Sequence, residues 1–108
     1  MTTVRQISVQ ELKNRLDSQP RLNIIDVREL HEWENMHIPQ ALHIPMAELP
    51  LRIKDIVADY NQPIYIHCQG GVRSHKSAQA LLDLGYQEVY SIDGGLSAWA
   101  NCGYPIES

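Results

Sequence analysis

Apolar and polar residues alternate along the chain in two different patterns. Short apolar runs, which are typical of buried strands, cover residues 22–26, 41–45, 63–67 and 88–92. The segments between them are amphipathic, with apolar residues three or four positions apart, as on one face of a helix. This alternation predicts an α/β fold. Because the sequence shows no repeat and no linker-like tract, we expect one domain over residues 1–108.

Capping residues delimit two of the predicted helices. Ser8 followed three residues later by Glu11 is a capping box, and the helix that it starts ends before Pro20. A helix over residues 74–84 is predicted with Ser74 as its N-cap. Both helices carry apolar residues on one face, so each is expected to pack against a sheet.

Three shorter helical segments complete the prediction. ELHEWEN at residues 29–35 predicts a brief helix in which Leu30 and Trp33 face inward. One or two helical turns are expected between Pro45 and residue 58, and a final helix from about Gly95.

Composition and charge narrow the class of protein. Of the 108 residues, 44% are hydrophobic and 20% charged, as in ordinary folded proteins. A net charge of −4 argues against nucleic acid or an anionic membrane surface as the main partner. No run has the pattern of a signal peptide or a membrane span, and two cysteines are too few for a disulfide scaffold. We therefore expect a reducing cytoplasm.

Polar residues with chemical potential follow two of the predicted strands. Asp26 ends the first apolar run, with Arg28 two residues later, and Cys68 directly follows the run at 63–67. In parallel α/β sheets, sites form beyond the carboxyl ends of the strands. The topology therefore predicts that Asp26, Arg28 and the loop after Cys68 lie close together.

The stretch HCQGGVRS, residues 67–74, has the composition of an anion-binding loop. A cysteine reacts as its thiolate, and lowering a thiol pKa by two units requires about 2.7 kcal/mol of preferential stabilisation of the anion. An exposed helix terminus supplies only about 0.3–1 kcal/mol. Gly70 and Gly71 allow successive backbone N–H groups to surround the sulfur, the following helix adds its free N–H groups, and Arg73 adds a positive charge. Together these groups predict a cradle for one anionic sulfur.

This loop resembles the active-site loop of rhodanese-family sulfurtransferases, whose pattern is a strand, C-x-x-G-x-R-S and a helix. DVRE at 26–29, HIPQA at 37–41 and GGLSAW at 94–99 are similar to further signatures of that family, in the same order. Met36 and Gln40 stand where glycines are usual, away from the cysteine loop. The resemblance implies a rhodanese-like α/β fold, with a central, mostly parallel five-stranded sheet flanked by helices on both faces.

The resemblance also implies a function. Cys68 would be the catalytic nucleophile, taking a sulfane sulfur from thiosulfate or a persulfide donor and passing it to cyanide or a thiol. Asp26 and Arg28 would support the site, and no metal or organic cofactor would be needed. The residues implied to bind the substrate are Gln69, Gly70, Gly71, Val72, Arg73 and Ser74.

Two alternative functions stay open from the sequence. One is a sulfur-relay or interaction module, which accepts persulfide sulfur from a partner protein and has little thiosulfate activity. The other is a cysteine phosphatase. The spacing disfavours it, because four residues separate Cys68 from Arg73 whereas the phosphatases of this general type use five.

Several single residues keep more than one interpretation. Arg73 either orients the donor and stabilises its charge or pairs with a carboxylate to hold the loop. Cys102 is a small structural or surface residue or, in the alternative, a resolving partner for Cys68. The five histidines invite a metal site, but HEWEN places Asn35 where the zinc motif H-E-x-x-H needs its second histidine. We therefore expect no metal.

Overall fold

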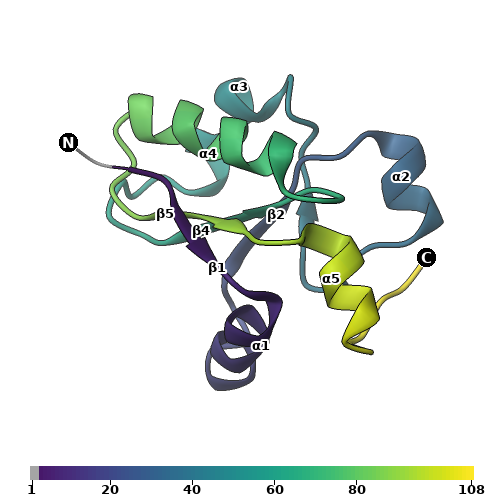
Figure 1. Ribbon diagram of the computed structural model, residues 1–108. Helices are drawn as coiled ribbons and strands as arrows, with labels where there is room; N and C mark the ends of the chain where they lie inside the picture. Colours follow the sequence, from purple (N-terminus) through teal and green to yellow (C-terminus); the bar gives the residue numbers. More distant parts are fainter. Residues whose placement is uncertain (1–2) are drawn as a thin grey trace.

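The computed structural model describes residues 3–108 as one parallel sheet covered by helices on both faces (Figure 1). The strand order is β1-β5-β4-β2-β3, and every pair of neighbouring strands runs parallel. The elements, in chain order, are β1 (Arg5–Ile7), α1 (Val9–Ser18), β2 (Asn23–Asp26), α2 (Leu30–Asn35), β3 (Leu42–His43), α3 (Leu49–Ile56), β4 (Ile64–His67), α4 (Val72–Asp83), β5 (Val89–Ile92) and α5 (Gly95–Asn101). The predicted five-stranded α/β fold is confirmed.

Two apolar clusters, one on each face, hold the helices to the sheet. Helices α3 and α4 cover one face, where Ile53 and Leu81 belong to the same buried cluster. Helices α1 and α5 cover the other face, where Leu12 and Trp99 belong to the second cluster. The central strand β4 is buried along its whole length, as expected for a parallel strand with helices on both sides.

The first strand was not predicted by the apolar pattern. β1 spans only RQI, and its residues are exposed, exposed and partly buried. It is nevertheless paired with β5, with Arg5 opposite Tyr90 and Ile7 opposite Ile92. An edge strand of this kind is defined by backbone hydrogen bonds rather than by burial of side chains, so the sequence carries little signal for it.

The helix caps differ from the prediction in two respects. Ser8 is the N-cap of α1, as predicted, and its Oγ accepts the Glu11 N–H at 3.1 Å; the Glu11 carboxylate instead lies 3.4 Å from Nε of Arg15. The prediction of Ser74 as the N-cap of α4 is wrong. α4 begins at Val72 because Gly71, with φ of 120°, turns the chain into the helix two residues earlier.

The short segments deviate more. The apolar run at 41–45 forms only the two-residue strand β3. Leu30, predicted to face inward, is 57% exposed, because it lies in the first turn of α2, which has no fully buried residue. Trp33 is partly buried and stacks on His37, with ring centroids 3.6 Å apart.

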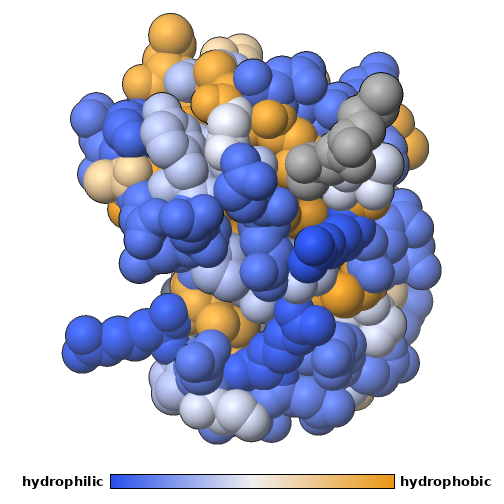
Figure 2. All heavy atoms as spheres, turned by 90° about the vertical axis from the view of Figure 1, so that its left-hand side faces the viewer, coloured by the Kyte–Doolittle hydropathy of each residue, from blue (hydrophilic) through white to orange (hydrophobic). Residues whose placement is uncertain are grey.

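The face on the left in Figure 1 is mostly polar. Figure 2 shows it covered by hydrophilic residues, with only small, separate hydrophobic areas. Within residues 3–108, none of the helices is both long enough and apolar enough to cross a membrane.

Substituting Leu81 by Ala should destabilise the fold through its larger apolar cluster. Leu81 is fully buried in α4, so L81A is expected to lower the free energy of unfolding by about 2–5 kcal/mol, measured by urea denaturation. Leu84, three residues further along the chain, is 46% exposed and provides the matched control. Equal losses for L81A and L84A would contradict the proposed packing of α4.

Candidate active site

Cys68 lies at the carboxyl end of the central strand. β4 ends at His67, Cys68 follows it, and α4 begins four residues later at Val72. Cys68 is only 1% exposed and belongs to the cluster beneath α3 and α4. Its position beyond the carboxyl end of a parallel strand is the one that the sequence predicted, and β4 lies at the middle of the sheet.

Backbone N–H groups of the loop and of α4 surround the Cys68 sulfur. Sγ accepts hydrogen bonds from the N–H of Gly71 at 3.0 Å and of Ser74 at 3.4 Å, and Oγ of Ser74 lies 3.6 Å away. Burial raises the pKa of Cys68. The hydrogen bonds from Ser74 and from the loop N–H groups more than offset this, so the pKa lies below its ordinary value. The arrangement favours a thiolate.

The first turn of α5 holds the loop from the other side. Leu96 N–H donates to the carbonyl of Cys68 at 2.9 Å, and Ser97 N–H donates to the carbonyl of Gln69 at 3.1 Å. This approach requires Gly95, which has φ of 53°; a Cβ there would collide with the Cys68 carbonyl and lie 2.8 Å from that of Gln69. The GGLSAW stretch therefore fixes the direction of the loop carbonyls, and with it the loop N–H groups.

Asp26 and Arg28 form a buried ion pair beside this loop. Arg28 Nη2 lies 2.8 Å from Oδ2 of Asp26, and Nε donates to both carboxylate oxygens; the two side chains are 1% and 0% exposed. Burial raises the pKa of Asp26, but the hydrogen bonds from Arg28 more than offset this effect. The pKa therefore lies below its ordinary value, and the carboxyl stays ionised. The predicted proximity of Asp26, Arg28 and the loop is therefore present in the structure.

Gln69 connects this ion pair to α5. Arg28 Nη1 donates to Oε1 of Gln69 at 3.1 Å, and Nε2 of Gln69 donates to Oγ of Ser97 at 3.0 Å. Both ends of the Gln69 amide are thus engaged within the protein, so this side chain braces the loop.

Arg73 is paired with a carboxylate that the sequence analysis did not identify. Its Nη1 and Nη2 lie 2.7 Å and 2.9 Å from the two oxygens of Glu32 in α2. These hydrogen bonds lower the pKa of Glu32 from 4.5 to about 2. Glu32 Oε1 also accepts the Glu29 N–H at 2.9 Å, so Glu32 both caps α2 and ties it to the loop. The spacing of Glu29 and Glu32 at the start of ELHEWEN was the available signal for this cap.

The remaining candidates are placed as follows. Val72 is 71% exposed and lines a hollow of about 400 Å³ next to the loop. The other lining residues are Gln6, Gly70, Gly71, His75, Lys76 and Asp93. Burial lowers the pKa of His67, whose Nε2 lies 3.5 Å from Oδ2 of Asp26.

Cys102 is exposed near the end of α5. In the described part of the chain, no three His, Cys, Asp or Glu side chains gather as metal ligands would.

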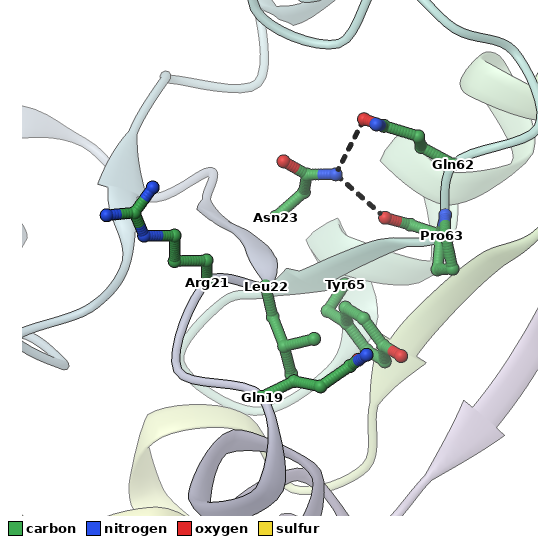
Figure 3. Close-up of a pocket in the computed structure, with 7 residues that line it drawn as sticks. All are labelled: Gln19, Arg21, Leu22, Asn23, Gln62, Pro63 and Tyr65. Carbon is green, nitrogen blue, oxygen red and sulfur yellow. Dashed lines mark hydrogen bonds between the residues drawn. The ribbon is translucent and has the colours of Figure 1, made fainter.

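A separate pocket lies at the opposite end of the sheet. It has a volume of about 260 Å³ at the start of β2 and β4, where Asn23 donates to the carbonyl of Pro63 at 3.1 Å (Figure 3). Tyr65 and Leu22 form part of its wall. Because it lies at the amino ends of the strands, it is distinct from the Cys68 loop.

Comparison with known proteins identifies the class to which this architecture belongs. The family model of the rhodanese-like domain matches residues 8–102, and the chain belongs to this family. It is 36% identical over 98 residues to the "Putative sulfur carrier protein YrkF" of Bacillus subtilis, covering 91% of this chain but only 52% of YrkF. It thus spans about half the length of that relative.

A second relative matches over most of both chains. The chain is 31% identical over 90 residues to "Thiosulfate sulfurtransferase GlpE" of Vibrio cholerae, with 83% of each protein covered. Among solved structures, a rhodanese-like domain protein from Staphylococcus aureus superposes with a TM-score of 0.80 at 36% identity, covering 97% of this chain and 100% of that one. These likenesses agree with the rhodanese-like fold of the chain.

The ionisation of Cys68 should depend on folding. Because its pKa is lower in the folded protein than the ordinary 9.0, the thiolate forms at a pH where the unfolded thiol is still protonated. The folded state therefore gains stability as pH rises from the folded pKa towards 9.0, and this contribution is lost as pH falls through the folded pKa. In Cys102→Ser protein, a pH titration of the thiolate absorbance should have a lower midpoint for the native protein than for the protein in denaturant. Equal midpoints would show that the loop donors do not stabilise the Cys68 thiolate.

Gly95→Ala should distort the loop. The added Cβ meets the Cys68 carbonyl, so we expect the native Cys68 midpoint to rise towards that of the denatured protein, with a loss of stability. Gly103→Ala is the control, because Gly103 also has a positive φ, 75°, but open space around its Cβ position. G103A should cost only about 1–2 kcal/mol of backbone strain. If G95A left the Cys68 midpoint unchanged, the contact with α5 would not shape the site.

The pair of Glu32 and Arg73 should contribute to stability in a defined pH range. With a folded pKa of about 2 against an ordinary 4.5, its contribution is complete above 4.5 and is lost as pH falls through about 2. Glu32→Gln should therefore lower the melting temperature most at neutral pH, and the difference from wild type should shrink between these values. Glu34→Gln, on the exposed side of α2, is the control. A difference independent of pH would refute the assignment.

Proposed function

We propose that this protein is a sulfurtransferase in which Cys68 carries a sulfane sulfur from thiosulfate or a persulfide donor to a thiol or cyanide. The observation that carries the proposal is that two backbone N–H groups, those of Gly71 and Ser74, donate to Sγ of Cys68. Such donors stabilise a thiolate and equally the terminal sulfur anion of a persulfide. Membership of the rhodanese-like family and the similarity to the thiosulfate sulfurtransferase GlpE support the same chemistry.

The reaction has two displacement steps. The Cys68 thiolate attacks the outer sulfur of thiosulfate, a new S–S bond forms, and the old S–S bond breaks as sulfite leaves with the electron pair. The nucleophilic acceptor then attacks the outer sulfur of the persulfide, and Cys68 departs as a thiolate again. The electron pairs balance in both steps without a metal or an organic cofactor. Cys68 alternates between two covalent states, which gives ping-pong kinetics.

The other loop residues have supporting roles in this proposal. Gly70, Gly71 and Ser74 offer donors to the sulfur, and Val72 forms an apolar wall at the rim. Asp26 and Arg28 fix the loop through Gln69. We assign Arg73 primarily to holding the loop, because both of its terminal nitrogens bind Glu32. Because Glu32 offsets most of its charge, we assign Arg73 only a secondary role in attracting an anionic donor.

A second candidate function is sulfur relay. The similarity to the "Putative sulfur carrier protein YrkF" favours this function, and the 1% exposure of Cys68 suits a sulfur that is transferred only within a docked complex. In this version the donor and the acceptor are proteins, and thiosulfate turnover is weak. We place either activity in a reducing compartment such as the cytoplasm, where Cys68 stays a free thiol.

Intact-protein mass spectrometry after incubation with thiosulfate tests the proposal. The wild-type protein should gain the mass of one sulfur atom and lose it on addition of cyanide or a thiol, because Cys68 is the only cysteine held by loop donors in residues 3–108. Cys68→Ser should gain nothing. Cys102→Ser, which alters the exposed thiol, should load like wild type.

The same measurement separates the two candidate functions. Loading by thiosulfate with fast release to a small thiol supports the sulfurtransferase. Slow loading by thiosulfate, together with fast loading by a cysteine desulfurase that carries a persulfide, supports relay. The absence of a Cys68-dependent mass gain with every donor would refute both.

A further inference from the structure

Ser91 is a buried polar residue next to the sulfur site that none of the sequence motifs includes. It lies in β5, is 1% exposed, and its Oγ is 2.7 Å from Oγ of Ser74. Ser74 is fully buried and contacts the Cys68 sulfur through both its N–H and its hydroxyl. Ser91 is therefore connected to Sγ through one intervening hydroxyl, that of Ser74.

The direction of the bond between the two serines follows from counting protons. Within residues 3–108, Ser74 Oγ is the only hydrogen-bond partner of the Ser91 hydroxyl. If Ser74 donated to Ser91, the proton of Ser91 would be buried without an acceptor, which is costly. If Ser91 donates to Ser74, both hydroxyls are satisfied. The second arrangement is thus strongly favoured.

With Ser91 as the donor, the proton of Ser74 is left for other acceptors. One is the carbonyl of Gly71, at 3.0 Å. The other is Sγ of Cys68, which as a thiol donates to Ser74 Oγ at 3.6 Å and becomes an acceptor once it is deprotonated. The Gly71 carbonyl also accepts the His75 N–H at 3.2 Å, so it keeps a partner when Ser74 turns away. The Ser74 hydroxyl can therefore donate to Gly71 while Cys68 is a thiol and to Sγ once Cys68 has lost its proton to solvent.

We propose that Ser91 is a positioning residue of the sulfur site, which donates to Ser74 and so commits the Ser74 proton to the thiolate or persulfide of Cys68. A hydroxyl that accepts one hydrogen bond is also a stronger donor, so the chain of bonds from Ser91 through Ser74 to Sγ is cooperative. This inference rests on the proposed function only in taking Cys68 as the sulfur carrier.

The test is a pH titration of the thiolate absorbance in Cys102→Ser protein, with and without Ser91→Ala. S91A should raise the midpoint, so that the thiolate population below the midpoint falls about three-fold. Ser77→Ala is the matched control. Ser77 is also a buried serine, 3% exposed, but its hydroxyl donates to the carbonyl of Arg73 at 2.8 Å. S77A should lower the melting temperature and leave the midpoint in place.

A double variant shows whether Ser91 acts through Ser74. In a Ser74→Ala background, S91A should add no further change to the midpoint, because the intermediate hydroxyl is gone. Ser91→Thr, which keeps the hydroxyl, should retain the wild-type midpoint. The proposal is overturned if S91A lowers the melting temperature without moving the midpoint, or if its effect is the same with and without Ser74.

Sulfur loading, measured by mass, separates this inference from the proposed function. If wild type loads sulfur and S91A leaves the midpoint unchanged, the inference about Ser91 is wrong and the function stands. If S91A moves the midpoint as expected but wild type takes up no sulfur from any donor, Ser91 positions Ser74 in a protein whose function lies elsewhere.

Discussion

The sulfur of Cys68 is buried at the end of the central strand, and burial opposes its ionisation. N–H groups from Gly71 and Ser74 offset this only because they point at the sulfur. Much of the surrounding structure holds these N–H groups in their orientation towards the sulfur. The positive φ of Gly71 starts α4 inside the loop, and the N–H groups of α5 hold the loop carbonyls on the opposite side. The site is therefore a property of backbone geometry as much as of side chains.

The charged residues around the loop act mainly as braces. Arg28 is neutralised by Asp26, and Arg73 by Glu32, with each guanidinium bound by two or more hydrogen bonds. Because both cations already face a carboxylate, stabilisation of the sulfur anion falls largely to neutral donors at short range. Neutral donors held in a buried site are screened little by salt and need no reorganisation when charge develops. Such a site suits a sulfur atom whose charge persists through both halves of a transfer cycle.

Local pattern was enough to predict much of this arrangement. The apolar runs ending at Asp26 and His67 predicted parallel strands with a site beyond their carboxyl ends. The structure places Arg28 beside the Cys68 loop, as this topology predicted. The pattern failed where structure depends on distant partners. β1 is recruited by backbone pairing with β5, and Leu30 is exposed because it lies in the first turn of α2, which has no fully buried residue. Glu32 and Ser91 meet the loop only after folding, so spacing along the chain did not indicate their contacts with Arg73 and Ser74.

The amide protons of Gly71 and Ser74 give the most direct view of the central claim, that backbone donors hold the charged sulfur of Cys68. In isotope-labelled Cys102→Ser protein, nuclear magnetic resonance should show both amide protons moving downfield as Cys68 ionises, with the midpoint seen by thiolate absorbance. Both should remain downfield when the sulfur is loaded, and neither should respond in a variant that also carries Cys68→Ser. If these two amides stayed unchanged while Cys68 ionised, the donors would not bind the anion and the account would be wrong.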